Sequence, residues 1–232
     1  MKLLVLDVET TTFQKGNPFS RNNKCCAVAY LCSTELGIKD NVIPWEYNSP
    51  VSVDYIKVMD QLIKDTELFI AFNAKFDLHW LRRCGIIDDY SLNFPIWDCQ
   101  LAQFIISHQQ MKYPSLEKSC EYWDIVGKFI DIETEYWSKG IDTPQVPWEV
   151  IYERGRSDVE LTYKLYQAQQ EYLRDKPDLL KLIELSCEDS LSLAEIEWNG
   201  LKYDVSESAV RAEKLEQQIK DIDENLRSIL GN

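Results

Sequence analysis

Two acidic side chains at the end of the first apolar segment are the clearest chemical feature of the sequence. Residues Leu3–Leu6 form an apolar run typical of a strand buried on both faces, and Asp7 and Glu9 follow it directly. Residues two apart on a strand point to the same side, so both carboxylates leave the strand at one place. Buried negative charge is costly without a cation, and carboxylate oxygens are ligands for Mg²⁺. The pair predicts a divalent-metal site; the alternative is a strand end whose acids face water or cap a turn through Thr10–Thr12.

A third carboxylate follows another predicted strand, over Leu68–Phe72. Asn73 is placed to cap the helix that comes next, so Asp77 lies in the first turn of that helix. In an open sheet, strands that run in the same direction end at one edge, and sites form there. Asp77 is therefore predicted to approach the first acid pair; the alternative is an acid that complements the helix dipole.

The segments around these residues predict an α/β domain. The first strand, a second over Lys24–Cys32 and a third over Gly37–Trp45 have the length and composition of neighbouring antiparallel strands. The polar stretch Phe13–Asn23 is predicted to be a loop beside the site. Residues 52–64 carry apolar side chains at helical spacing, which predicts an amphipathic helix against the sheet.

Composition limits the possible partners. The 232 residues are 45% hydrophobic and 12% aromatic, which is enough for a packed core and excludes a disordered chain. The formal net charge is −14, and a uniformly acidic surface repels nucleic acid. A nucleic-acid partner would need local basic residues, bridging metals or another part of a larger protein. The candidates for local positive charge are Lys75, Arg82, Arg83, Arg154 and Arg156.

The cysteines and the apolar segments indicate in which cellular compartment the protein is expected. Seven cysteines, an odd number, show no zinc-like pair of pairs, which favours reduced and mostly buried thiols. We find no signal peptide and no apolar stretch long enough to span a membrane. The expected location is the cytoplasm, with no membrane partner.

The acidic segments resemble the motifs of a known family. Asp-Val-Glu-Thr after the first strand and Asn-Ala-Lys-Phe-Asp at a strand-to-helix turn resemble the first two motifs of the 3′–5′ exonucleases with a four-carboxylate (DEDD) site. Residues Arg154–Thr162 resemble the third motif of the family. This segment contains Asp158 and lies in a helix predicted from about Pro147 to Tyr172. Residues Trp97–Ala102 and Ser115–Glu117 resemble helices between the motifs. The resemblance implies a ribonuclease-H-like α/β fold with a mixed central sheet flanked by helices, plus a C-terminal helical extension.

The resemblance also implies the metal ligands. Asp7, Glu9 and Asp158 would hold one divalent ion, either Mg²⁺ or Mn²⁺. Asp7 would bridge to a second ion, and Asp77 would act mainly through the waters of that ion. Two such cations stabilise the attacking and leaving oxygens in phosphodiester hydrolysis, and one lowers the pKa of a bound water. Without metal the four carboxylates repel one another, so the metal-free site is expected to be the least settled part of the domain.

The implied substrate contacts come from three residues. Asn73 and the backbone around Thr10 would hold the 3′-terminal nucleotide, and Phe13 would wedge against its base. Stacking of a base on an aromatic ring has no sequence preference, as a proofreading enzyme requires. The alternative for Phe13 is an ordinary contact between loop and core.

One position departs from the family pattern. The family's tyrosine lies one helical turn before the third-motif aspartate and orients the attacking water. Here that position is Arg154. Tyr152 lies about 120° around the helix from Asp158, so it could take over only if Gly155 made the helix irregular. Arginine cannot act as a base, but it can bind the scissile phosphate or pair with the carboxylates, so Arg154 joins the predicted catalytic set.

The end of the chain resembles the segment that joins exonuclease to polymerase in family A DNA polymerases. Residues Glu184–Val205 match a long helix, a turn at Asn199-Gly200 and a short strand. Ser206 to about Leu230 match the first thumb helix; the alternative is a dimerisation or packing helix. We expect an exonuclease domain over residues 1–175 and a connecting region over 176–232, with most of a phage or bacterial polymerase lying beyond.

Two functions follow from these residues. The first is a metal-dependent 3′–5′ exonuclease that proofreads single-stranded or frayed 3′ ends of DNA for an attached polymerase; the presence of all four acids favours it. The second is a weak or silent exonuclease-like scaffold or single-strand-binding module, which Arg154 favours. A stand-alone RNA-trimming relative is a third, and the polymerase-like tail argues against it.

Overall fold

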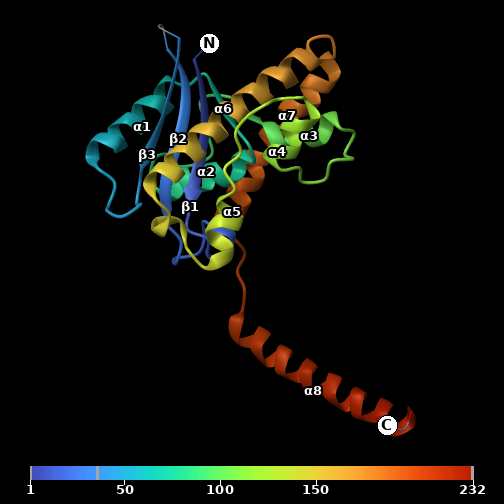
Figure 1. The fold of residues 1–232 in the computed structure, drawn as a ribbon. Coiled ribbons are helices and arrows are strands. Elements are labelled where there is room, and N and C mark those ends of the chain that lie inside the picture. The colour runs from blue at the N-terminus through green and yellow to red at the C-terminus, as the bar shows by residue number, and fades with distance from the viewer. Residues whose placement is uncertain (1, 35–36, 231–232) are drawn as a thin grey trace. The chain divides into compact units, whose positions relative to one another are not determined.

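The computed structural model describes residues 2–34 and 37–230 (Figure 1). The chain forms two compact units, one that ends at Trp198 and one that begins at Asn199. Within the described residues, no helix is both long enough and apolar enough to cross a membrane.

The first unit is built on a five-stranded sheet with the strand order β3-β2-β1-β4-β5. β1 is antiparallel to β2, and β2 is antiparallel to β3, as predicted for the start of the sheet. β1 is parallel to β4, and β4 is parallel to β5, so the sheet is mixed. The strands are β1 (Leu3–Thr10), β2 (Cys25–Thr34), β3 (Gly37–Pro44), β4 (Leu68–Ala71) and β5 (Ile96–Asp98).

Helices cover the sheet and link its strands. α6 crosses one face in front of β1 and β2, while α1 and α2 lie behind the sheet (Figure 1). The α-helices of this unit are α1 (Val53–Asp65), α2 (Ala74–Arg83), α3 (Cys99–Ile106), α4 (Leu116–Tyr122), α5 (Ile132–Glu135), α6 (Trp148–Leu173) and α7 (Pro177–Asn199), the last of which ends at the boundary. Short 3₁₀ turns occupy η1 (Phe13–Gly16), η2 (Trp137–Lys139) and η3 (Thr143–Gln145). The predicted fold class, a mixed sheet between helices, is confirmed.

The central strand β1 explains why the first acid pair lies where it does. Leu4, Val5 and Leu6 are at most 1% exposed, because β2 and β4 pair with this strand on its two sides and helices cover both faces. The pairing with β2 is irregular between Glu9 and Thr10. Such irregularities end regular pairing and redirect side chains, and they are common beside active sites. β1 therefore carries its acids from a rigid interior to the edge of the sheet.

The long helix α6 depends on a glycine to lie close to the sheet. A Cβ atom added at Gly155 would lie 2.9 Å from the Cβ of Ala29 on β2, which is closer than real Cβ contacts allow. The helix is continuous through this residue, from Trp148 to Leu173. Gly155 therefore serves close helix–sheet packing, and the predicted possibility of an irregular helix at this point is wrong.

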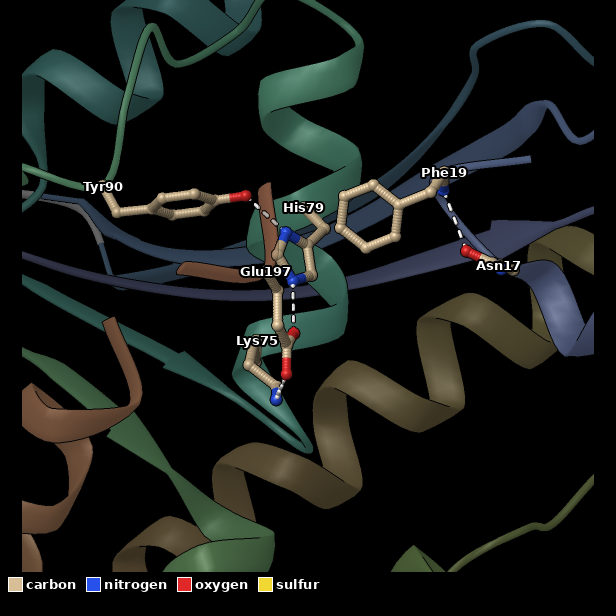
Figure 2. A network of polar contacts seen from close by, with 6 residues as sticks. All are labelled: Asn17, Phe19, Lys75, His79, Tyr90 and Glu197. Atoms are coloured by element: carbon tan, nitrogen blue, oxygen red, sulfur yellow. Dashed lines mark hydrogen bonds and ion pairs between the residues drawn. The ribbon is translucent and has the colours of Figure 1, made fainter. Parts of the chain in front are cut away.

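A polar network joins α2 to the last turns of α7 (Figure 2). His79 is buried, its Nδ1 is hydrogen-bonded to the Tyr90 hydroxyl, and its Nε2 lies 3.0 Å from Glu197 Oε2. The other oxygen of Glu197 accepts a hydrogen bond of 2.6 Å from Lys75 Nζ. Beside this network, Arg82 pairs with Glu195 at 2.9 Å and lies over the ring of Trp198. These contacts fasten α7 to the compact unit as far as Trp198.

The second unit is a single long helix, α8 (Val205–Leu230). None of its residues is buried, and an apolar series that includes Leu215, Ile219, Ile222 and Leu226 is at least half exposed. The short strand predicted after Gly200 is absent: residues 201–204 contain neither helix nor strand. A strand needs a hydrogen-bonded neighbour, and this described segment has none.

Candidate active site

Three of the predicted acids converge where α6 crosses β1. Asp7 and Glu9 come from alternate positions of β1, and Asp158 comes from α6. The carboxylate oxygens that the three residues can offer to one ion all lie within 4.8 Å of one another. Two elements far apart in the sequence thus present one group of hard oxygen ligands.

The fourth acid, Asp77, lies beside this group. It occupies the first turn of α2 and is 2% exposed. Its Oδ1 accepts a hydrogen bond of 3.0 Å from the backbone N–H of Val8, between the two acids of β1. Asp77 is therefore fixed against β1 next to the three-residue group, although it is not a member of the tight cluster.

The negative charge of these buried carboxylates is only partly compensated by nearby positive charge. Burial, together with repulsion from Glu9 and Asp158, raises the pKa of Asp7 well above its ordinary value. Burial and the nearby Asp7 likewise raise the pKa of Asp77. Burial raises the pKa of Asp158 to about 7, although Arg154 opposes this shift. Oxygen ligands in this state fit a hard divalent cation, which would supply the missing charge.

Arg154 is the cation that the chain itself places in the group. Its Nε donates a hydrogen bond of 2.5 Å to Glu9 Oε1 and lies 3.6 Å from Asp158 Oδ2. Although burial opposes its charge, the surrounding carboxylates raise the pKa of Arg154 further, so it stays protonated. Tyr152 packs beside Trp148 instead, with ring centres 6.3 Å apart. Because α6 is continuous, Tyr152 does not replace the hydroxyl that Arg154 displaces.

A cavity of about 630 Å³ opens over the acids. Its volume lies in the range of pockets that hold small ligands. Phe76 from α2 and Trp137 from η2 supply aromatic walls, and Lys15 supplies a basic side chain. The other residues that line it are Asp7, Val8, Glu9, Thr10, Thr11, Thr12, Gly16, Glu133, Ser138 and Arg154.

One wall of this cavity comes from a segment for which the sequence predicted no role, α5 with η2. The chain directly after η2 is tied to the end of β1. Asp142 Oδ1 accepts a hydrogen bond of 2.8 Å from the Thr12 backbone N–H. Thr143 Oγ1 donates one of 2.6 Å to the Thr10 carbonyl. These bonds hold the segment beside the end of β1, and Trp137 and Glu133 line the cavity. Both residues are brought to the site by contacts between distant parts of the chain.

The opposite wall depends on Gly16. Its backbone has φ +70°, and an added Cβ would lie 2.2 Å from Thr10 Oγ1. Its carbonyl accepts a hydrogen bond of 3.1 Å from Trp80 Nε1. The preceding residue, Lys15, also adopts a positive φ of 58° and lines the cavity. The predicted loop is thus a built turn that brings Lys15 to the acids.

The three predicted substrate residues lie in different places. Thr10 lines the cavity over the acids. Asn73 lines a separate cavity of about 460 Å³, together with Lys112 and Tyr113. Phe13 is 48% exposed and lines neither cavity. The aromatic residues that face the acids are Phe76 and Trp137, and the wedge role of Phe13 stays a prediction.

The helix cap at Asn73 differs from the sequence-based expectation. Asn73 precedes α2 with a left-handed backbone, φ +66°, and its side chain makes no capping hydrogen bond. Asp98, at the end of β5, accepts hydrogen bonds from the backbone N–H groups of Asn73 and Ala74 at 3.1 and 2.9 Å. It also caps α3 through Gln100 and Leu101. One buried carboxylate therefore fixes the start of two helices, which frees the Asn73 side chain.

The basic residues expected near phosphates are already engaged. Lys75 pairs with Glu197, Arg82 with Glu195, and Arg156 with Asp40. Arg83 donates hydrogen bonds to the carbonyls of Pro18, Ser20 and Asn23. Lys75 also lines the cavity at Asn73, and the role of these residues near phosphates stays a prediction. Among the described residues that line the cavity over the acids, the basic ones are Lys15 and Arg154.

The comparisons with known proteins agree with this geometry. No protein-family model matches the sequence. The chain is 24% identical over 235 aligned residues to the DNA polymerase of Bacillus phage SP01, which covers 95% of this chain and 25% of that protein. The chain thus spans about a quarter of the length of that polymerase.

Solved structures of NrnC from Brucella melitensis share the fold. NrnC alone aligns with a TM-score of 0.59, NrnC bound to pGG with 0.57, and NrnC with bound Mg²⁺ with 0.56. Each is 18% identical and covers 88% of this chain and 89% of its own. The resemblance predicted from the motifs is confirmed at this level. The chain shares the fold of NrnC, with a mixed sheet flanked by helices, and it is similar to the DNA polymerase of a phage.

Proposed function

We propose that the first unit of this exonuclease-like chain is a metal-dependent 3′–5′ exonuclease that proofreads for a DNA polymerase. The observation that carries the proposal is the convergence of Asp7, Glu9 and Asp158 within 4.8 Å, beside a cavity of about 630 Å³ that Asp7 and Glu9 line. Carboxylates whose pKa values are raised by burial and by neighbouring charges, and which lie at a cavity, mark a candidate functional site.

The proposed cofactors are two divalent ions, Mg²⁺ or Mn²⁺. Asp7, Glu9 and Asp158 would hold one of them, and Asp7 with Asp77 would serve the other. When bound, the ions would neutralise the acids, lower the pKa of a water and stabilise charge on the oxygens of the scissile phosphate. The fixed position of Asp77, through its bond to the Val8 N–H, supports this division of roles. One of the NrnC structures has bound Mg²⁺, which agrees with this choice of metal.

The proposed substrate is the single-stranded or frayed 3′ end of DNA. The cavity over the acids would take the terminal nucleotide, with Phe76 and Trp137 against its base and Lys15 near a phosphate. Asn73 would contact a nucleotide further upstream, because the cavity that it lines also contains Tyr113 and Lys112. Local basic and aromatic groups would thus hold DNA on a chain of strongly negative net charge.

The proposed partner is the remainder of a polymerase chain. The similarity to a phage DNA polymerase about four times as long supports this partner. We place the protein in the cytoplasm of a bacterium or of a phage-infected cell, where such an enzyme would meet replicating DNA.

A second candidate is a weak or silent exonuclease-like module that binds single strands or acts as a scaffold. One observation favours it: the Arg154 guanidinium already pairs with Glu9 and Asp158. Arginine cannot accept a proton from water at neutral pH, so position 154 does not supply the catalytic hydroxyl of the family.

Degradation of a 5′-labelled single-stranded oligonucleotide with Mg²⁺ or Mn²⁺ tests the first candidate. The native chain should give a ladder that shortens from the 3′ end, and Asp7→Ala should abolish it. Asp54→Ala is the matched control, since this acid is 91% exposed on α1 and should keep full activity. Absence of a ladder from a folded, DNA-binding native chain would favour the silent module.

Arg154→Tyr separates the two candidates directly. If the native site is impaired, the substitution restores the family hydroxyl and should raise the rate of hydrolysis by about tenfold or more. A rate that falls from a measurable native value means that the arginine contributes to the native reaction, and the silent module is then the wrong choice. Absence of hydrolysis by both folded proteins favours the silent module.

A further inference from the structure

Arg154 connects the acids to the wall of the cavity that α5 and η2 form. On one side its Nε bonds to Glu9 Oε1 at 2.5 Å and lies 3.6 Å from Asp158 Oδ2. On the other side its Nη1 donates a hydrogen bond of 3.0 Å to the Ile130 carbonyl, and its guanidinium lies 5.5 Å from the centre of the Trp137 ring. One side chain therefore touches both the proposed metal ligands and the segment that carries Trp137.

The wall at Trp137 carries an unsatisfied polar group. Trp137 Nε1 is buried and has no hydrogen-bond partner, and among the described residues it is the only buried side-chain nitrogen or oxygen in this condition. Buried donors are almost always paired, so an orphan indicates that a ligand or another arrangement satisfies it. The base of the segment is held to α6 independently, because Ser157 donates a hydrogen bond to the Lys128 carbonyl. Movement of Trp137 would thus pivot on a fixed base.

A metal ion and Arg154 compete for the same oxygens. Glu9 and Asp158 are proposed ligands, and both lie within 4 Å of the guanidinium. At that distance in a poorly solvated site, a positive charge repels an incoming cation strongly. If the ion takes Glu9 Oε1, the oxygen that Arg154 holds, the carboxylate must leave the guanidinium. The guanidinium also bonds to the Ile130 carbonyl and lies beside Trp137, so a shift of Arg154 away from Glu9 would change the surroundings of Trp137.

We propose that Arg154 is a positioning residue, an internal cation that holds the metal-free carboxylates and whose displacement by a divalent ion moves the Trp137 wall of the cavity. The inference rests on the proposed metal site. It explains why an arginine stands where the family has a hydroxyl: the residue couples metal loading to the shape of the nucleotide cavity.

Metal affinity and the environment of Trp137 test the proposal without any measurement of hydrolysis. The 232-residue chain is labelled with 5-fluorotryptophan, the Trp137 resonance is assigned with Trp137→Phe, and Mg²⁺ or Ca²⁺ is titrated by ¹⁹F NMR and calorimetry. In the native chain the Trp137 resonance should move as the metal binds. In Arg154→Gln the metal should bind about tenfold more tightly, because the competing charge is gone, and the Trp137 resonance should no longer follow binding.

Two further variants sharpen the result. Arg154→Lys keeps the charge and should return the metal affinity to within about threefold of the native value, which a purely structural role would not do. Arg156→Gln removes an arginine from the same helix that pairs with Asp40 outside the cavity, and it should change neither readout. Thermal melts check that each variant is folded. If Arg154→Gln does not fold, the comparison of the native protein with the Arg154→Lys variant still tests whether metal binding moves Trp137.

The outcomes separate this inference from the proposed function. Metal binding with an unmoved Trp137 resonance, or with equal affinity in Arg154→Gln, overturns the coupling and leaves the metal site intact. Failure of both the native chain and Arg154→Gln to bind metal at millimolar concentration overturns the metal site and the coupling together.

Discussion

Two polar clusters meet at α2, and they are built on opposite principles. Asp77 faces β1 and the acids, whereas His79, two residues further on, belongs to the network with Tyr90, Glu197 and Lys75 (Figure 2). In that network each charged group meets a partner of suitable type. In the acid cluster, carboxylates gather around the single guanidinium of Arg154. The network holds α7 against α2. The acid cluster has negative charge that Arg154 compensates only in part, as the proposed metal site requires.

The two clusters also differ in how pH acts on them. Burial raises the pKa values of Asp7, Asp77 and Asp158, so the folded protein binds these protons more tightly than the unfolded chain does. Burial lowers the pKa of His79, so there the folded protein binds the proton less tightly. Rising pH therefore destabilises the first cluster, and falling pH destabilises the second.

The largest effect is expected from the loss of one acid. Asp158→Asn should lower the rate of 3′ degradation by about a thousandfold or more, because a neutral amide is a poor ligand for a hard cation. The same change should stabilise the metal-free protein at pH 7 by about 1–2 kcal/mol, since it removes a buried charge of raised pKa. Urea unfolding in EDTA beside the nuclease assay measures both. A loss of stability together with activity would mean that Asp158 is structural.

A large effect on stability is expected at Asp98, which fixes the starts of α2 and α3. Asp98 is buried and accepts four backbone N–H bonds at the starts of α2 and α3. Asp98→Ala leaves these donors unpaired and should cost about 3 kcal/mol of unfolding free energy. Ser115→Ala is the matched control, because Ser115 caps α4 through one bond of 3.2 Å and should cost about 1 kcal/mol. Equal losses in the two variants would contradict the double role of Asp98.

The pH dependence of the metal-free protein should show the strain of the acid cluster. A raised pKa contributes stability that is complete below about pH 4 and is lost as pH rises through the folded value, about 7 for Asp158. In EDTA we expect the unfolding free energy to fall by about 2 kcal/mol between pH 5 and pH 7.5. Calorimetry across this range measures the fall, which Mg²⁺ should abolish and Asp158→Asn should reduce. A flat profile in EDTA would show that the acids are already compensated.

The smallest effect is expected in the balanced network. Glu197→Gln removes the charged partner of His79 and Lys75 and should cost about 1 kcal/mol, because the pair is partly exposed. Nuclease activity should stay within about twofold of the native value, since no residue of the network lines the cavity over the acids and Lys75 keeps its place at the Asn73 cavity. Thermal unfolding and the ladder assay measure the two quantities. A large loss of activity would mean that the two clusters are coupled through α2.

Local patterns predicted the first strand and α1, and the resemblance to the exonuclease motifs predicted the fold class and the approach of Asp158 to the other acids. The apolar run before Asp7 predicted a buried strand, and β1 is the centre of the sheet. The helical spacing over residues 52–64 predicted α1, and the third motif predicted α6 with Asp158 one turn after Arg154. The first strand and α1 follow from period and spacing, which are properties of neighbouring residues, whereas Asp158 was found through the order of the family's motifs.

Contacts between distant residues decided the rest. Asn73 had the composition of a cap, yet Asp98 from another strand takes the backbone donors. Gly155 looked like a weak point of a helix, but it allows α6 to lie against Ala29. Trp137 joined the cavity through bonds that its segment makes to the end of β1. The sequence by itself determined the strand, the helix and the four acids, because periodicity and motif order are local. The tertiary structure alone decided which charges remain unpaired, because a residue's partners are set by the packing of elements far apart along the chain.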